Sequence, residues 1–204
     1  MTASRDDKKI ITHHRPDLRE KLFFCISGFI ISVPLTLFIG TFTDHLCAVM
    51  PIFYATLCTT AIFTPFIEEF AKAYPLFYRH GETEKSIFTL GFLVGLGFGL
   101  SEFFVYILAL GAPVSIRLPM IFFHAASTSI TAYGIATKRP ARFYLTAVAL
   151  HFSNNFSALF GPFWFIGGVA AVVIAYFLSW RFYRKTSERF FDFECIEKST
   201  EFKP

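Results

Sequence analysis

Six long apolar segments, separated by short polar stretches, dominate the chain. A helix that crosses the hydrocarbon core of a bilayer needs about 20 mostly apolar residues, and each segment comes close to or exceeds that length. The six are Leu22–Phe42, Pro51–Tyr78, Ser86–Leu110, Leu118–Thr137, Phe143–Phe160 and Pro162–Trp180. The pattern predicts an all-α, polytopic membrane bundle of about six transmembrane helices. No internal repeat is evident, which argues against a transporter built from two related halves.

The second segment contains three prolines, Pro51, Pro65 and Pro75. Because proline lacks an N–H group, it breaks or kinks a helix and leaves backbone carbonyls without their usual donors. Pro65 comes just before two adjacent glutamates. We therefore expect a kink at this point that turns the glutamate side chains in a new direction.

The charge distribution predicts how the bundle sits in the membrane. Of the 19 Lys and Arg residues, 17 lie in the two tails and in alternate loops. These regions are Met1–Lys21, Arg79–Lys85, Lys138–Arg142 and the segment from Arg181. The positive-inside rule places them, and hence both termini, in the cytoplasm. The opposite side has only Arg117, so we interpret the net charge of +4 as a membrane signal and exclude nucleic-acid binding.

The predicted organisation has three parts. Residues 1–21 form a cytoplasmic N-terminal segment, residues 22–180 the transmembrane domain, and residues 181–204 a cytoplasmic basic and aromatic tail. The tail either lies along the membrane surface or is solvated. The four cysteines form no C-x-x-C pair, so we expect small buried apolar side chains, with neither a disulfide framework nor a zinc–cysteine site.

The third segment carries glycines at four-residue spacing, Gly91, Gly95 and Gly99. Such a stripe lets a second helix approach closely. Close packing here would also bring Glu102, which is one turn further along, against a neighbouring helix.

The glutamate pair is the most unusual feature of the apolar segments. Even on a lenient scale, one charged side chain at the bilayer centre costs roughly 2.5–3.5 kcal/mol. Lys72 lies four residues after Glu68 and three after Glu69, so it can neutralise either one from the same helix. The other glutamate is then expected to be protonated or paired with a histidine. A base and an acid would thus lie side by side, as water activation requires.

The next three segments carry the remaining polar groups of this kind, Glu102, His124 and His151. Each histidine has a hydrogen-bonding residue four positions later, Thr128 or Asn155. Any one of these groups is compatible with a structural role, as an ion pair or as hydrogen-bonded packing. Six ionisable groups on four segments favour a four-helix catalytic core with two supporting helices.

Together these residues resemble the PrsW family of intramembrane proteases, within the glutamate intramembrane endopeptidases that include the CAAX prenyl proteases. The matching motifs follow one another on consecutive segments. They are Glu68-Glu69-x-x-Lys72, Phe98-x-x-x-Glu102, His124-x-x-x-Thr128 and His151-x-x-x-Asn155. The CAAX enzymes carry an arginine after the glutamates and a histidine in the second motif, so Lys72 and Glu102 favour the PrsW branch.

The resemblance implies hydrolysis of a peptide bond in a membrane-anchored protein, such as an anti-sigma factor, in the cytoplasmic membrane of a prokaryote. By position, Glu68 would activate the water, helped by Glu69 or Glu102. His151 and Asn155 would donate hydrogen bonds to the oxyanion. His124 would orient the water or a carboxylate, with Lys72 and Thr128 in support.

Both the expected cofactor and the expected class of function have alternatives. The CAAX resemblance implies metal-free glutamate chemistry, so the expected cofactor is none. A zinc site is the alternative, with Glu68, Glu102, His124 and His151 as its ligands, although no H-E-x-x-H motif is present. The alternative functions are a non-catalytic scaffold subunit, as in the related Aph-type subunit of gamma-secretase, and a proton-coupled transporter.

Overall fold

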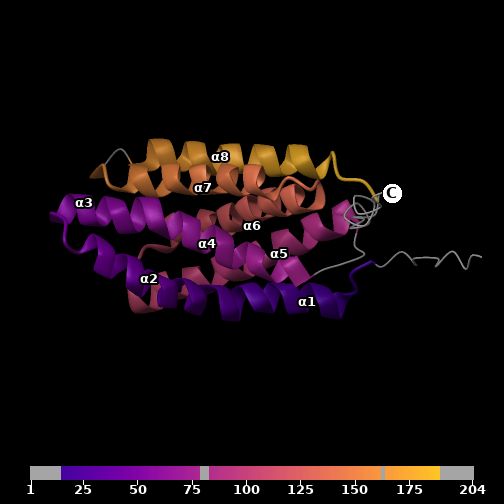
Figure 1. The fold of residues 1–204 in the computed structure, drawn as a ribbon, viewed down its shortest axis with the longest axis horizontal. Helices are drawn as coiled ribbons and strands as arrows, with labels where there is room; N and C mark the ends of the chain where they lie inside the picture. Colours follow the sequence, from indigo (N-terminus) through magenta and orange to yellow (C-terminus); the bar gives the residue numbers. More distant parts are fainter. Residues whose placement is uncertain (1–14, 79–82, 162–163, 189–204) are drawn as a thin grey trace, which may run out of the picture.

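The computed structural model describes residues 15–78, 83–161 and 164–188, which form six helical rods and no β-strand. The rods lie side by side along the long axis of the molecule (Figure 1). In chain order the helices are α1 Leu18–Ser27, η1 Gly28–Ser32 and α2 Val33–Cys47; α3 Ile52–Thr56, η2 Leu57–Phe63, α4 Thr64–Ala73 and η3 Tyr74–Tyr78; α5 Glu84–Phe104 and η4 Val105–Ala109; α6 Val114–Ala136; α7 Pro140–Ala158; and α8 Trp164–Tyr183. The all-helical prediction is confirmed.

Three of the described rods are long and apolar enough to cross a membrane by themselves. They are Leu18–Cys47, Glu84–Ala109 and Phe165–Tyr183. The other three, which run through α4, α6 and α7, carry most of the ionisable and hydroxyl side chains of the interior, and this lowers their hydropathy. The count of six spans and the cytoplasmic termini stay predictions, and the predicted course of the tail beyond residue 188 lies outside the described residues.

Helix α5 is held between α1 and α6 by glycines. A Cβ atom on Gly95 would lie 2.3 Å from the carbonyl oxygen of His124, and one on Gly99 would lie 2.7 Å from Ile121 Cα, both on α6. On the other side, Gly97 meets the backbone of Cys25 just as closely. The prediction of a glycine-mediated helix contact is confirmed, and its partner is the helix that carries His124.

The interruption predicted for the second rod at Pro65 is present as a change of helix type. Segment η2 is a π-helix in which the Thr64 N–H bonds to the Thr59 carbonyl, five residues back. The next carbonyl, that of Thr60, would pair with position 65, but Pro65 has no N–H. The side-chain amide of Asn155 on α7 donates to it instead, at 3.0 Å. The chain then continues as α4, with Pro65 in its first turn.

A disulfide contradicts the interpretation of the cysteines. Cys47, the last residue of α2, is bonded to Cys58 in η2, and their Cα atoms are 5.9 Å apart. The prediction that the cysteines form no disulfide was wrong for these two residues. The turn before Pro51 folds the second rod back against the first and brings the two thiols together. The bond lies at the end of the bundle opposite the basic loops. Cys25 is a free, half-buried thiol.

Candidate functional site

The side chain of Glu69 is the centre of a buried polar cluster. Its Oε1 atom lies 2.6 Å from the Lys72 ammonium nitrogen and accepts hydrogen bonds from Ser127 Oγ at 3.1 Å and His151 Nδ1 at 2.9 Å. These groups come from α4, α6 and α7. Glu69 and Lys72 have no exposed surface at all. The sequence left open which glutamate Lys72 neutralises, and in the structure it is Glu69.

Lys72 also joins Glu69 to His124. Its ammonium nitrogen is 3.0 Å from His124 Nδ1 and lies over the ring of Phe98, 4.8 Å from the ring centre. An ammonium group can only donate, so His124 Nδ1 accepts and its proton is on Nε2. That nitrogen is 2.5 Å from Glu102 Oε2 on α5. The contact confirms that the glycine packing brings Glu102 against a neighbouring helix.

Arg117, near the start of α6, binds the other oxygen of Glu102 at 2.6 Å. Its guanidinium lies 3.4 Å from the ring centre of Tyr106. Both side chains of this ion pair are 17% exposed, unlike the fully buried pair of Glu69 and Lys72. Arg117 was not among the predicted site residues. Apart from Lys72, it is the only Lys or Arg outside the basic tails and loops, and this isolation was a usable signal.

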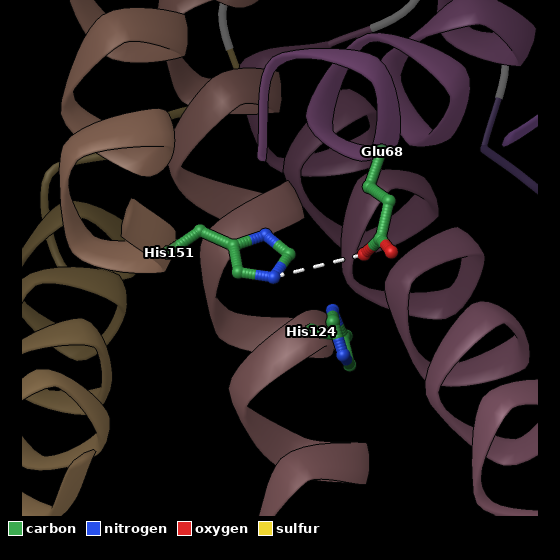
Figure 2. Close-up of side chains that lie close together, drawn as sticks. All are labelled: Glu68, His124 and His151. Atoms are coloured by element: carbon green, nitrogen blue, oxygen red, sulfur yellow. Dashed lines mark ion pairs between the residues drawn. The ribbon is translucent and has the colours of Figure 1, made fainter. Parts of the chain in front are cut away.

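Of the three glutamates in the cluster, Glu68 makes the fewest interactions with protein groups. It is 8% exposed, and its Oε2 atom is 3.7 Å from His151 Nε2, beyond hydrogen-bond distance. Figure 2 shows the His151 ring directed at this carboxylate, with the His124 ring beside them. Among the described residues, no protein group hydrogen-bonds to Glu68 Oε2 or to Glu69 Oε2. Both oxygens therefore have unused acceptor capacity, but only Glu68 has exposed surface at which a ligand can reach it.

Three of these residues offer a set of donors for a metal ion. One donor atom each from Glu68, His124 and His151 lie within 4.8 Å of one another. Two imidazoles and a carboxylate are a common catalytic zinc set, which leaves one position for water. Because His151 Nδ1 donates its proton to Glu69, the lone pair of Nε2 is free to bind a metal ion. Carboxylates commonly orient metal-binding histidines in this way.

His124 fits a metal less well than His151 does. Both of its ring nitrogens already have a protein partner, Lys72 on one side and Glu102 on the other. Metal binding by His124 would therefore require it to give up one of these contacts. Glu102, which the sequence analysis included among the ligands, is not in the group of three.

The remaining predicted site residues lie at the edge of the cluster. Asn155 is one turn beyond His151, and its amide nitrogen binds the Thr60 carbonyl. The Thr128 hydroxyl donates to the backbone carbonyl of His124 at 2.8 Å, so it contacts the helix that carries the histidine and not the imidazole. Ser127, which the sequence analysis missed, is the hydroxyl that binds Glu69; it lies three residues after His124, on the same helical face.

The comparisons with known proteins give one match. No curated protein and no solved structure matches the chain. A family model described as PrsW family intramembrane metalloprotease matches residues 18–181, which run from the start of α1 to the last turn of α8. The match favours a protease over the scaffold and the transporter. The chain therefore belongs to the PrsW family of intramembrane proteases.

Proposed function

We propose that this membrane-embedded peptide hydrolase cleaves a membrane-anchored protein, such as an anti-sigma factor, with a water activated at Glu68. The observation that carries the proposal is the contrast between the adjacent carboxylates. Glu69 Oε1 accepts from three buried donors, whereas Glu68 Oε2 has no hydrogen-bond partner among the described residues and lies beside the free nitrogen of His151.

In this proposal Glu69 determines which ring nitrogen of His151 carries the proton. Because Nδ1 donates to Glu69, Nε2 presents a lone pair toward Glu68. Glu68 takes the proton that water loses as it attacks the peptide carbonyl and passes it to His151 Nε2. The protonated Nε2 then donates to the oxyanion, the role that the family resemblance assigns to it, and gives the proton to the leaving amine when the carbon–nitrogen bond breaks.

Asn155 is the second proposed oxyanion donor. Its amide nitrogen carries two hydrogens, and the bond to the Thr60 carbonyl uses one of them. The other remains for the oxyanion. The same bond ties α7 to the rod that carries Glu68.

Two ways of activating the water are compatible with the cluster. Glu68, His124 and His151 would hold a divalent metal ion such as zinc, and a bound ion would supply Lewis-acid polarisation of the scissile carbonyl and acidify water. The contacts of His124 with Lys72 and Glu102 favour the metal-free form, in which Glu68 acts directly. The family description favours the metal.

The test uses the purified full chain in liposomes with candidate single-span substrates. We expect Glu68→Gln to lower the cleavage rate by about 10²–10⁴-fold, the usual contribution of a general base, without changing thermal stability. Glu20→Gln at the start of α1 is the control for loss of a carboxylate. Undiminished cleavage by Glu68→Gln would refute the proposal. Chelation with metal analysis separates the two forms: activity that survives in metal-free protein excludes the metal.

We further propose six spans with both termini in the cytoplasm. Disulfides persist in oxidising compartments, and the bond between Cys47 and Cys58 lies at the end opposite the basic loops. Tags on both termini should be protected from external protease in intact cells. Cleavage of one tag alone would contradict the even number of spans, and cleavage of both would contradict the cytoplasmic orientation.

A further inference from the structure

Two cavities meet at Thr89, at the basic end of the bundle. One, of about 160 Å³, lies between α1 and α5 and is lined by Arg15, Lys21 and Lys85. The other, of about 360 Å³, lies between α5 and α8 and is lined mainly by aromatic side chains, among them Trp180. Thr89 borders both. Helix α5 thus presents a cationic hollow and an apolar groove on neighbouring parts of its surface.

The cationic hollow keeps an excess of positive charge. Its lining contains three cations and one carboxylate, Glu188, which lies 3.8 Å from Lys85. Residues after α8 close one side, because Ser187 Oγ and N–H donate to Glu84 and the Ser187 carbonyl accepts from the Lys85 N–H. Among the described lining residues, two positive charges therefore remain for an anion.

The apolar groove suits an acyl chain. Phe88 and Phe92 lie one turn apart on α5, and Tyr176 and Trp180 lie one turn apart on α8, so the groove runs along the helices. The side chain of Trp180 is 56% exposed. Tryptophan and tyrosine at the end of a membrane helix are typical of the interface where headgroups meet acyl chains.

We propose that the two cavities bind one anionic phospholipid, with its phosphate among Arg15, Lys21 and Lys85 and an acyl chain along Trp180. Basic hollows between helices on the cytoplasmic side are the kind of site that recognises anionic headgroups. The inference requires only that the bundle spans a membrane. It is independent of how the protease activates water.

Trp180 makes the proposal measurable. The chain has two tryptophans, so Trp164→Phe leaves Trp180 as the sole tryptophan reporter. The protein is reconstituted in two vesicle types of identical headgroup composition, phosphatidylcholine with a minor share of phosphatidylglycerol. Bromine is placed on the acyl chains of the phosphatidylglycerol in one type, and of an equal share of the phosphatidylcholine in the other. We expect brominated phosphatidylglycerol to quench Trp180 at least about twofold more strongly.

Two triple variants decide whether the cavity or the general surface charge attracts the lipid. Arg15→Gln/Lys21→Gln/Lys85→Gln should abolish the preference for phosphatidylglycerol. Lys138→Gln/Arg139→Gln/Arg142→Gln removes three charges from the loop between α6 and α7 and should retain it. Equal quenching by the two lipids in the parent chain, or equal loss in both variants, would overturn the proposal. So would abolition of the preference by inorganic phosphate at constant ionic strength, because the site would then bind free anions.

Discussion

The site contains two ion pairs that differ in burial: one is fully buried and the other is partly exposed. Glu69 and Lys72 lie three residues apart on α4, and neither has exposed surface. Glu102 and Arg117 come from α5 and α6, near the end where the disulfide lies, and both are partly exposed. We call the first the inner pair and the second the outer pair. His124 contacts one member of each.

The difference in burial suggests a structural role for the inner pair and a role in substrate contact for the outer pair. A buried ion pair must be assembled as the protein folds, and removing one member leaves an uncompensated charge. A partly exposed pair is held less tightly and can exchange partners with a ligand. We infer that the inner pair sets the geometry of His151 and His124, and that the outer pair lies where a substrate arrives.

The largest predicted effect is on the inner pair. Lys72→Met keeps the length of the side chain but leaves the Glu69 carboxylate without its counter-charge. We expect a loss of about 3–5 kcal/mol in the free energy of unfolding, measured by thermal or denaturant unfolding in detergent.

A double variant provides the control for this prediction. Lys72→Met combined with Glu69→Gln removes both charges and should recover most of the lost stability, while cleavage stays low because His151 is no longer anchored by a carboxylate. If Lys72→Met is as stable as the parent, the inner pair has no scaffolding role.

Asn155 gives the next largest effect. Asn155→Ala removes the proposed oxyanion donor, which should lower kcat by about 10²–10³-fold with little change in KM. Loss of its bond to the Thr60 carbonyl should cost only about 1 kcal/mol of stability. The matched control is Asn154→Ala on the same helix. A fall in stability without a fall in kcat would show that Asn155 only stabilises the backbone before Pro65.

The sequence predicted the residues of the site better than their connections. The ionisable groups of the four central segments do gather, and the spacing of Glu68, Glu69 and Lys72 narrowed the ion pair to two choices. The choice depends on Ser127 and His151, which approach Glu69 from other helices. Helical periodicity carries no information on such contacts.

The features that the sequence missed are long-range ones. Cys47 and Cys58 meet only because the chain turns back between two apolar rods, and nothing in their spacing indicates this. Arg117 appears alone in a predicted loop, so its pairing with Glu102 required the close packing of α5 on α6. The change of helix type before Pro65, by contrast, is local, and the proline alone indicated where the helix would be interrupted.

A smaller effect is expected where the two pairs are joined. The contact between Glu102 and His124 depends on the close approach of α5 and α6 at Gly95. Gly95→Ala would place a Cβ 2.3 Å from the His124 carbonyl, so the helices must separate. We expect a loss of about 1–3 kcal/mol in unfolding free energy and a lower cleavage rate. Gly40→Ala is the control, since no atom lies within 4 Å of that Cβ. Equal stability of the two variants would contradict the packing argument.

The smallest effect is predicted for the outer pair itself. Arg117→Gln should change stability by less than about 1 kcal/mol, because the ion pair is partly exposed. We expect cleavage to fall roughly tenfold, since Glu102 loses the group that holds it against His124 and such couplings are commonly worth about 1–3 kcal/mol. Arg117→Lys keeps the charge but not the stacking on Tyr106, so it should fall between the parent and Arg117→Gln. The measurements are kcat and KM beside thermal stability. If Arg117→Gln lowers the free energy of unfolding as much as Lys72→Met does, the outer pair also has a structural role and the distinction between the pairs fails.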